Sequence, residues 1–168
     1  MRISPAEGSD GISLGALKGR AVNIRDAVPI RVVLADDSLA VRDVLAHILD
    51  RSPGLDLVAT ADDEPTLLAA IEETRPDVVV TDVRMPPTGT DEGVRIAEHL
   101  ATAHPEIGVV VLSQYSDPEW LSRVFDRGSE NRGWVMKERA HSGGQLISAI
   151  QTVSEGDRWI DPSVMAPE

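Results

Sequence analysis

The stretch Ile30-Arg-Val-Val-Leu-Ala-Asp-Asp37 joins an apolar run to two adjacent carboxylates. A short apolar run bounded by turn residues predicts a β-strand, which here ends at the carboxylates. Two later stretches have the same form: Asp77-Val-Val-Val-Thr81 runs into Asp82, and Arg132-Gly-Trp-Val-Met136 runs into Lys137. The sequence therefore predicts three strands, each with charged side chains at its carboxyl end.

Helical patterns alternate with strand patterns from Ile30 onward. The predicted strands are 30–35, 55–60, 77–81, 108–112 and 132–136. The predicted helices follow a Ser38 cap, the Asp63-Glu64-Pro65 opening, a start near Asp91, the Asp117-Pro118 opening and a start near Leu146. Five strands alternating with five helices predict an α/β fold, a doubly wound five-stranded parallel sheet with helices on both faces.

Composition limits the possible functions. The 168 residues suit one domain, and 16 Lys and Arg against 28 Asp and Glu give a formal net charge of −12, which opposes direct binding to nucleic acid or an anionic membrane. No cysteine occurs, which excludes a thiol nucleophile and suits a reducing cytosol, so a cytoplasmic location is expected. Residues 1–29 contain four glycines and no long apolar run, and they are predicted to be a flexible N-terminal extension.

Charged residues at strand ends should meet, because the carboxyl ends of parallel strands lie at one edge of the sheet. Asp36, Asp37 and Asp82 would then bring three carboxylates together, and their mutual repulsion favours a bound hard cation such as Mg²⁺. Asp82 would be a nucleophile able to take a phosphoryl group, with Lys137 neutralising charge on the phosphoryl oxygens. Taken singly, each aspartate fits a cap or turn and Lys137 fits a solvated loop. Their joint arrangement favours the site.

The order of these residues resembles a known family. Asp36-Asp37, Asp82, Ser113 and Lys137 follow the first, third, fourth and fifth strands in the order found in receiver domains of two-component response regulators, and Asp82-Val-Arg-Met-Pro86 matches the stretch after that family's phosphorylated aspartate. The resemblance covers residues 30–156 and implies the flavodoxin-like (βα)5 form of the fold. Leu112-Ser-Gln-Tyr115 and the phrase from Met85 to Gly93 are most similar to actinobacterial regulators of the LuxR/NarL type.

The resemblance implies a role for each site residue. Asp82 would accept a phosphoryl group from a histidine kinase, with Mg²⁺ bound by Asp37 and Asp82, by Asp36 through water and by the backbone carbonyl of Arg84. Lys137 and the Ser113 hydroxyl would contact the phosphoryl oxygens. The protein would then be a signalling phosphoacceptor and not an enzyme with turnover.

A switch is also implied. Phosphorylation would draw Ser113 toward the phosphoryl group and let the aromatic ring of Trp134 rotate inward, which changes the surface of the fourth helix, fifth strand and fifth helix. Trp134 as ordinary core packing is the competing interpretation. Arg84 and Tyr115 would line the pocket entrance, where their bulk could slow attacking water.

The sequence departs from the family pattern in three places, of which Arg84 and Tyr115 at the pocket entrance are one. Gly93 lies 11 residues after Asp82, later than the corresponding glycine of the family, and Pro86-Pro87 stiffens the longer loop. Glu138 follows Lys137 where many receivers have a cis-proline. Kinase access and the rate of dephosphorylation need not be typical of the family.

Residues 157–168, which begin Asp157-Arg-Trp-Ile-Asp-Pro162, resemble the start of a linker to a helix-turn-helix output domain. DNA would be contacted only through such a domain, and a homodimer is possible. Both a receiver cut from a longer regulator and a stand-alone receiver stay open. Two other functions also stay open: a pseudo-receiver that binds partners without phosphorylation, and a Mg²⁺-dependent phosphohydrolase, which would need a longer substrate-holding insertion.

Overall fold

The computed structural model describes residues 28–126 and 130–165. The extension predicted for residues 1–29 therefore lies, except for Val28 and Pro29, outside the described residues. None of the helices in the described part of the chain has the length and apolar character that crossing a bilayer demands.

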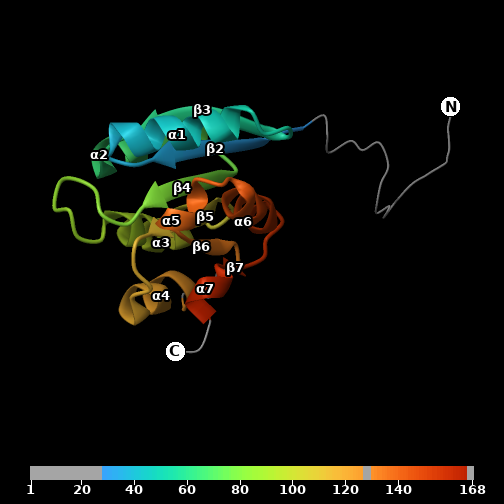
Figure 1. The fold of residues 1–168 in the computed structure, drawn as a ribbon. Coiled ribbons are helices and arrows are strands. Elements are labelled where there is room, and N and C mark those ends of the chain that lie inside the picture. The colour runs from blue at the N-terminus through green and yellow to red at the C-terminus, as the bar shows by residue number, and fades with distance from the viewer. Residues whose placement is uncertain (1–27, 127–129, 166–168) are drawn as a thin grey trace, which may run out of the picture.

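The described residues form one parallel sheet with six strands. These are β2 (Ile30–Ala35), β3 (Leu55–Ala61), β4 (Val78–Asp82), β5 (Gly108–Ser113), β6 (Arg132–Met136) and β7 (Trp159–Ile160). Their order is β3-β2-β4-β5-β6-β7, which Figure 1 shows as a stack from β3 at the top to β7 at the bottom. The predicted parallel α/β fold is confirmed, and β7 adds a sixth strand that the sequence pattern did not indicate.

Seven helices occur in the described part of the chain. They are α1 (Leu39–Asp50), α2 (Glu64–Thr74), α3 (Glu92–Ala103), α4 (Pro118–Phe125), α5 (Lys137–Ala140), α6 (Gly144–Ser154) and α7 (Pro162–Met165). Ser38, Asp63 and Asp117 each accept a backbone N–H of the following helix, as their predicted capping roles require. Asp91 precedes α3 without a side-chain cap.

Two apolar layers cover the sheet. Successive strand residues point to opposite faces, so Val32 and Leu34 belong to the apolar layer that includes α1 and α6. Val33 and Ala35 belong to the layer that includes α2, α3 and α4. The central strands β4 and β5 are buried along their whole length. This burial explains their continuous Val runs, since both faces must be apolar.

The strand order reverses beside β2. From β2 the chain passes to β3 on one side and later to β4 on the other, so the connections after β2 and β4 diverge. A crevice opens outside the carboxyl ends of the strands at such a reversal, and this is where open α/β sheets bind ligands. The predicted site residues follow these strand ends.

Candidate functional site

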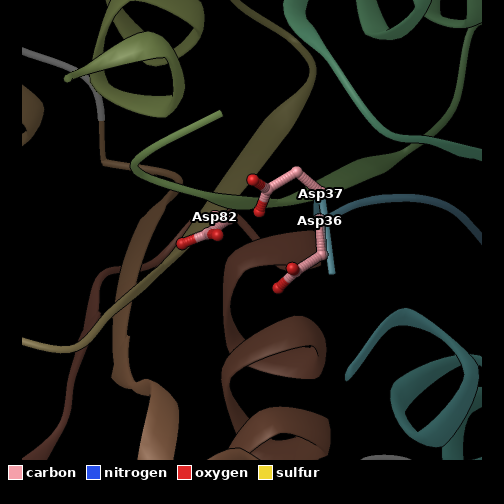
Figure 2. A group of neighbouring side chains, drawn as sticks. All are labelled: Asp36, Asp37 and Asp82. Carbon is pink, nitrogen blue, oxygen red and sulfur yellow. The ribbon is translucent and has the colours of Figure 1, made fainter. Parts of the chain in front are cut away.

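Three carboxylates meet at the reversal point. Asp36 and Asp37 directly follow β2 and Asp82 is the last residue of β4, and one carboxylate oxygen from each lies within 4.8 Å of the others. Figure 2 shows the three side chains gathered between the two strand ends. Asp36 and Asp82 are buried and Asp37 is exposed. The structure therefore brings together the three acidic residues singled out in the sequence.

Lys137 supplies the opposing charge. It directly follows β6, and its ammonium donates to Asp82 Oδ2 at 2.9 Å and lies 3.0 Å from Asp36 Oδ2. Asp36 is itself oriented, since its Oδ1 accepts the Ser38 N–H at 2.9 Å. One ammonium thus faces two carboxylates, with Asp37 alongside.

Burial and charge set the protonation of this group. Burial raises the pKa of Asp82 to about 6, helped by the charges of Asp36 and Asp37, although the hydrogen bond from Lys137 acts in the opposite direction. Burial alone would lower the pKa of Lys137, but its contacts with Asp82 and Asp36 outweigh burial and raise it. Near pH 7 the site therefore holds an ammonium beside a largely ionised Asp82.

A cavity of about 730 Å³ opens over Asp82. Its lining includes the predicted entrance residues Arg84 and Tyr115. The Arg84 guanidinium lies over two rings, 5.6 Å from the centre of Tyr115 and 5.4 Å from that of Trp120. Trp120 belongs to the first turn of α4, and sequence reasoning did not give it an entrance role. The cavity lining therefore places one guanidinium against two aromatic rings.

Ser113 and Trp134, the predicted switch pair, occupy β5 and β6. Ser113 is buried and lines the cavity, but its hydroxyl donates to Tyr115 O at 2.6 Å and accepts from Tyr115 N at 3.1 Å. Trp134 is fully buried in the apolar layer that includes Val124 and Phe125, and its Nε1 has no hydrogen-bond partner among the described residues. The Trp134 indole therefore lies inside the protein, and the Ser113 hydroxyl is hydrogen-bonded to the backbone of the loop that follows β5.

The lengthened loop after β4 is organised by Glu92, which sequence reasoning did not single out. The Glu92 side chain is fully buried and accepts the backbone N–H groups of Thr88 at 2.6 Å and Thr90 at 3.1 Å. Burial opposes its charge, but these bonds and that from the Thr88 hydroxyl lower the pKa of Glu92 to about 2. A carboxylate in the first turn of a helix usually faces solvent, so only the folded loop reveals this role.

Gly93 brings α3 against the site strand. Its N–H donates to Val83 O at 2.8 Å, and a Cβ at this position would clash with the backbone carbonyl of Asp82. Only glycine permits this approach. The later position of Gly93 in the sequence therefore still places it beside Asp82.

The acidic group fits a hard divalent cation. All three side chains offer carboxylate oxygens, the ligands that Mg²⁺ prefers, and the buried Asp36 Oδ2 shares the Lys137 ammonium with Asp82. One nearby ammonium does not balance three carboxylates. A cation held by these oxygens would offset the excess negative charge.

Comparison with known protein families gives one match to this region. Residues 32–151 match the response regulator receiver domain. Among curated proteins, the oxygen regulatory protein NreC of Staphylococcus carnosus is 31% identical over 135 residues, which are 80% of this chain and 59% of that protein. The chain thus spans less than two thirds of the length of this relative.

Solved structures agree with these sequence matches. The signal receiver domain of the response regulator NarL from Mycobacterium tuberculosis is 25% identical with a TM-score of 0.66, over 77% of this chain and 98% of that one. A LuxR-family response regulator from Aurantimonas is 26% identical with a TM-score of 0.70, over 82% and 93% of the two chains. The isolated REC domain of RcsB from Salmonella, 24% identical over 82% of this chain and 96% of that one, shares the fold with a TM-score of 0.69.

Proposed function

Because the chain belongs to the response regulator receiver domain family, we propose that it is the phosphoacceptor of a two-component system and takes a phosphoryl group on Asp82 from a histidine kinase. The single observation that carries the proposal is the meeting of Asp82 with Lys137, Asp36 and Asp37 at the mouth of a cavity. These four residues come from the ends of three strands, β2, β4 and β6, which are far apart in the sequence.

The chemistry assigns each side chain a task. A carboxylate oxygen of Asp82 attacks phosphorus, the bond from phosphorus to the donor histidine nitrogen breaks, and an acyl phosphate remains. No separate base is needed, since Asp82 is largely ionised above its pKa of about 6. The Lys137 ammonium binds a phosphoryl oxygen where it now binds Asp82 Oδ2.

Mg²⁺ would be held by Asp37 and Asp82, by Asp36 through water and by the Arg84 carbonyl, and when bound it supplies positive charge against the phosphoryl oxygens. The oxygen-only donor set and the excess of three carboxylates over one ammonium support this assignment. The protein acts once per phosphoryl group received, as a signalling phosphoacceptor and not as an enzyme of metabolism.

The switch would operate between β5 and β6. We propose that the Ser113 hydroxyl exchanges its partners on Tyr115 for a phosphoryl oxygen, while the buried Trp134 ring occupies the space beside it. The affected surface is that of α4, β6 and α6, which are the fourth helix, fifth strand and fifth helix predicted from sequence. A partner that prefers the phosphorylated form would stabilise that form by its differential affinity.

The regulated output is proposed from the relatives. RcsB has been solved as two dimers bound to two parallel DNAs, and NreC is longer than this chain. We propose that residues 30–156 are the cytoplasmic receiver and that residues 157–168, which include β7 and α7 packed beside β6, lead toward a DNA-binding output domain. We also propose that the assembled regulator dimerises. Residues 1–29 would be an extension outside the receiver.

Acetyl phosphate tests the proposal directly. The purified protein is incubated with Mg²⁺ and acetyl phosphate and followed by intact mass, beside Asp82→Asn and the matched control Asp50→Asn, which changes an exposed aspartate at the end of α1. One Mg²⁺-dependent phosphoryl adduct is expected in the wild-type protein and Asp50→Asn but not in Asp82→Asn. Absence of the adduct from the wild-type protein would refute the proposal and favour a pseudo-receiver.

A further inference from the structure

The C-terminal segment Arg158–Met165 folds back onto β6. Trp159 and Ile160 pair with Gly133 and Trp134 as β7, and the Asp161 N–H donates to Trp134 O at 2.9 Å. Figure 1 shows β7 and α7 at the end of the sheet beside β6. The segment therefore contacts the strand that delivers Lys137.

Asp161 is the centre of this contact. Its side chain is fully buried, and its Oδ2 accepts the Met136 N–H at 3.1 Å. Its Oδ1 lies 3.1 Å from Arg139 Nε and accepts the N–H and hydroxyl of Ser163 at 3.0 and 2.8 Å. A buried carboxylate is costly without partners, and here both oxygens are satisfied.

These contacts bracket Lys137. Asp161 reaches the backbone of Trp134 and Met136 before it and the side chain of Arg139 after it. Glu138 follows Lys137, so no proline ring fixes the backbone at this junction. The Met136 N–H, one residue before Lys137, is instead held by a carboxylate from 25 positions further along the chain.

We infer that Asp161 is a positioning residue, which fixes the junction between β6 and α5 and so holds the Lys137 ammonium against Asp82. This inference rests on the proposed function. On this inference the C-terminal segment is part of the receiver site, because the packing of β7 against β6 also orients Lys137.

A purely structural role for Asp161 makes a different prediction. Loss of a structural contact lowers the unfolding temperature but leaves the folded molecules reacting at the normal rate. A positioning role lowers the rate of phosphoryl uptake in folded protein, because a misplaced group forfeits part of its stabilisation of the transition state. No hydrogen bond or ion pair of the described residues joins Asp161 to Asp36, Asp37 or Asp82, so Mg²⁺ affinity should not fall.

The test uses the full chain with Asp161→Ala, Asp161→Ser, Asp161→Asn and Ser163→Ala. Serine keeps a small polar group but is too short to bridge Met136 and Arg139, and it serves if the alanine variant does not fold. Asparagine keeps a carbonyl oxygen for the Met136 N–H. Ser163→Ala removes one donor to Asp161 and leaves the Met136 contact in place.

At saturating Mg²⁺ and acetyl phosphate, we expect Asp161→Ala and Asp161→Ser to take up the phosphoryl group about tenfold more slowly than wild type. Asp161→Asn should recover most of the rate, and Ser163→Ala should match wild type. Mg²⁺ affinity, measured by tryptophan fluorescence, should not fall in any of these variants. The Met136 amide should exchange its hydrogen faster in Asp161→Ala and Asp161→Ser only.

A folded Asp161→Ala or Asp161→Ser protein with the wild-type rate would overturn the inference. So would an asparagine variant as slow as alanine, or a parallel loss of Mg²⁺ affinity. If the wild-type protein takes up no phosphoryl group, the proposed function fails, and amide exchange at Met136 alone decides whether Asp161 holds the junction.

Discussion

The Lys137 ammonium donates a 2.9 Å hydrogen bond to Asp82 Oδ2, across 55 positions of sequence. The same ammonium lies 3.0 Å from Asp36 Oδ2. A single side chain at the end of β6 is therefore tied to the ends of both strands that flank the reversal point of the sheet. Lys137 and Asp82 also line the cavity in which we propose that the phosphoryl group binds.

Lys137→Ala should separate cation binding from phosphoryl transfer. We expect the rate of phosphorylation by acetyl phosphate to fall about 100-fold, because a charge that stabilises the phosphoryl oxygens is lost. Mg²⁺ affinity should rise, since three carboxylates are left without their ammonium. Fluorescence titration and intact mass measure the two effects, and weaker Mg²⁺ binding in the variant would contradict this account.

Glu92→Gln should destabilise the protein in a pH-dependent way. The folded pKa of about 2 lies below the ordinary 4.5, so ionised Glu92 contributes stability above pH 4.5 that is lost as the pH falls from 4.5 toward 2. This difference between the two pKa values corresponds to roughly 3 kcal/mol of folding stability at pH 7. Urea unfolding at several pH values checks it, with Glu119→Gln, in the exposed first turn of α4, as the matched control. If the difference in unfolding free energy between Glu92→Gln and wild type did not shrink at low pH, the destabilisation would not come from the charge of Glu92.

Tyr115→Ala should shorten the lifetime of the phosphoryl group on Asp82. The ring is 56% exposed, so unfolding stability should change by less than about 0.5 kcal/mol. Loss of the contact between Arg84 and the Tyr115 ring, worth about 0.5–1 kcal/mol, should speed hydrolysis roughly two- to fivefold. The decay of the adduct mass gives the lifetime. Tyr115→Phe keeps the ring and should decay like wild type, and equal lifetimes in all three proteins would exclude a gating role.

Gly93→Ala should damage both folding and the site. The added methyl group would meet the Asp82 carbonyl, so α3 or the end of β4 must shift, at a cost of about 1–3 kcal/mol. Gly144→Ala is the control, because a Cβ there has no atom within 4 Å and alanine favours a helix. Thermal unfolding and phosphoryl uptake measure the two effects. Equal behaviour of the two variants would show that the close approach is not required.

The acidic site could be predicted from sequence because topology alone determines it. Once residues 30–35 and 77–81 are recognised as parallel strands, Asp36, Asp37 and Asp82 must share an edge. Lys137 follows from the same argument at β6. The structure brings these four residues together without any further information about side-chain packing.

Other features depend on partners that no local pattern names. Glu92 resembles a solvent-facing residue of a first helical turn until the loop of Thr88 and Thr90 closes over it. Asp161 resembles a turn residue before a proline, and β7 has only two residues, too few for a periodic signal. The sequence predicts that the Ser113 hydroxyl contacts a phosphoryl oxygen. Its hydrogen bonds to Tyr115 depend on the path of the loop after β5, which no local pattern indicates.

The pairing of β7 with β6 also affects the tendency of the protein to aggregate. A sheet that ended at β6 would present unpaired N–H and C=O groups, and such an edge is a template on which strands of other molecules add. Trp159 and Ile160 occupy the middle of that edge, and the buried carboxylate of Asp161 closes it. The two residues of β7 leave a shorter unpaired edge than the five residues of β6 would, which disfavours edge-to-edge aggregation.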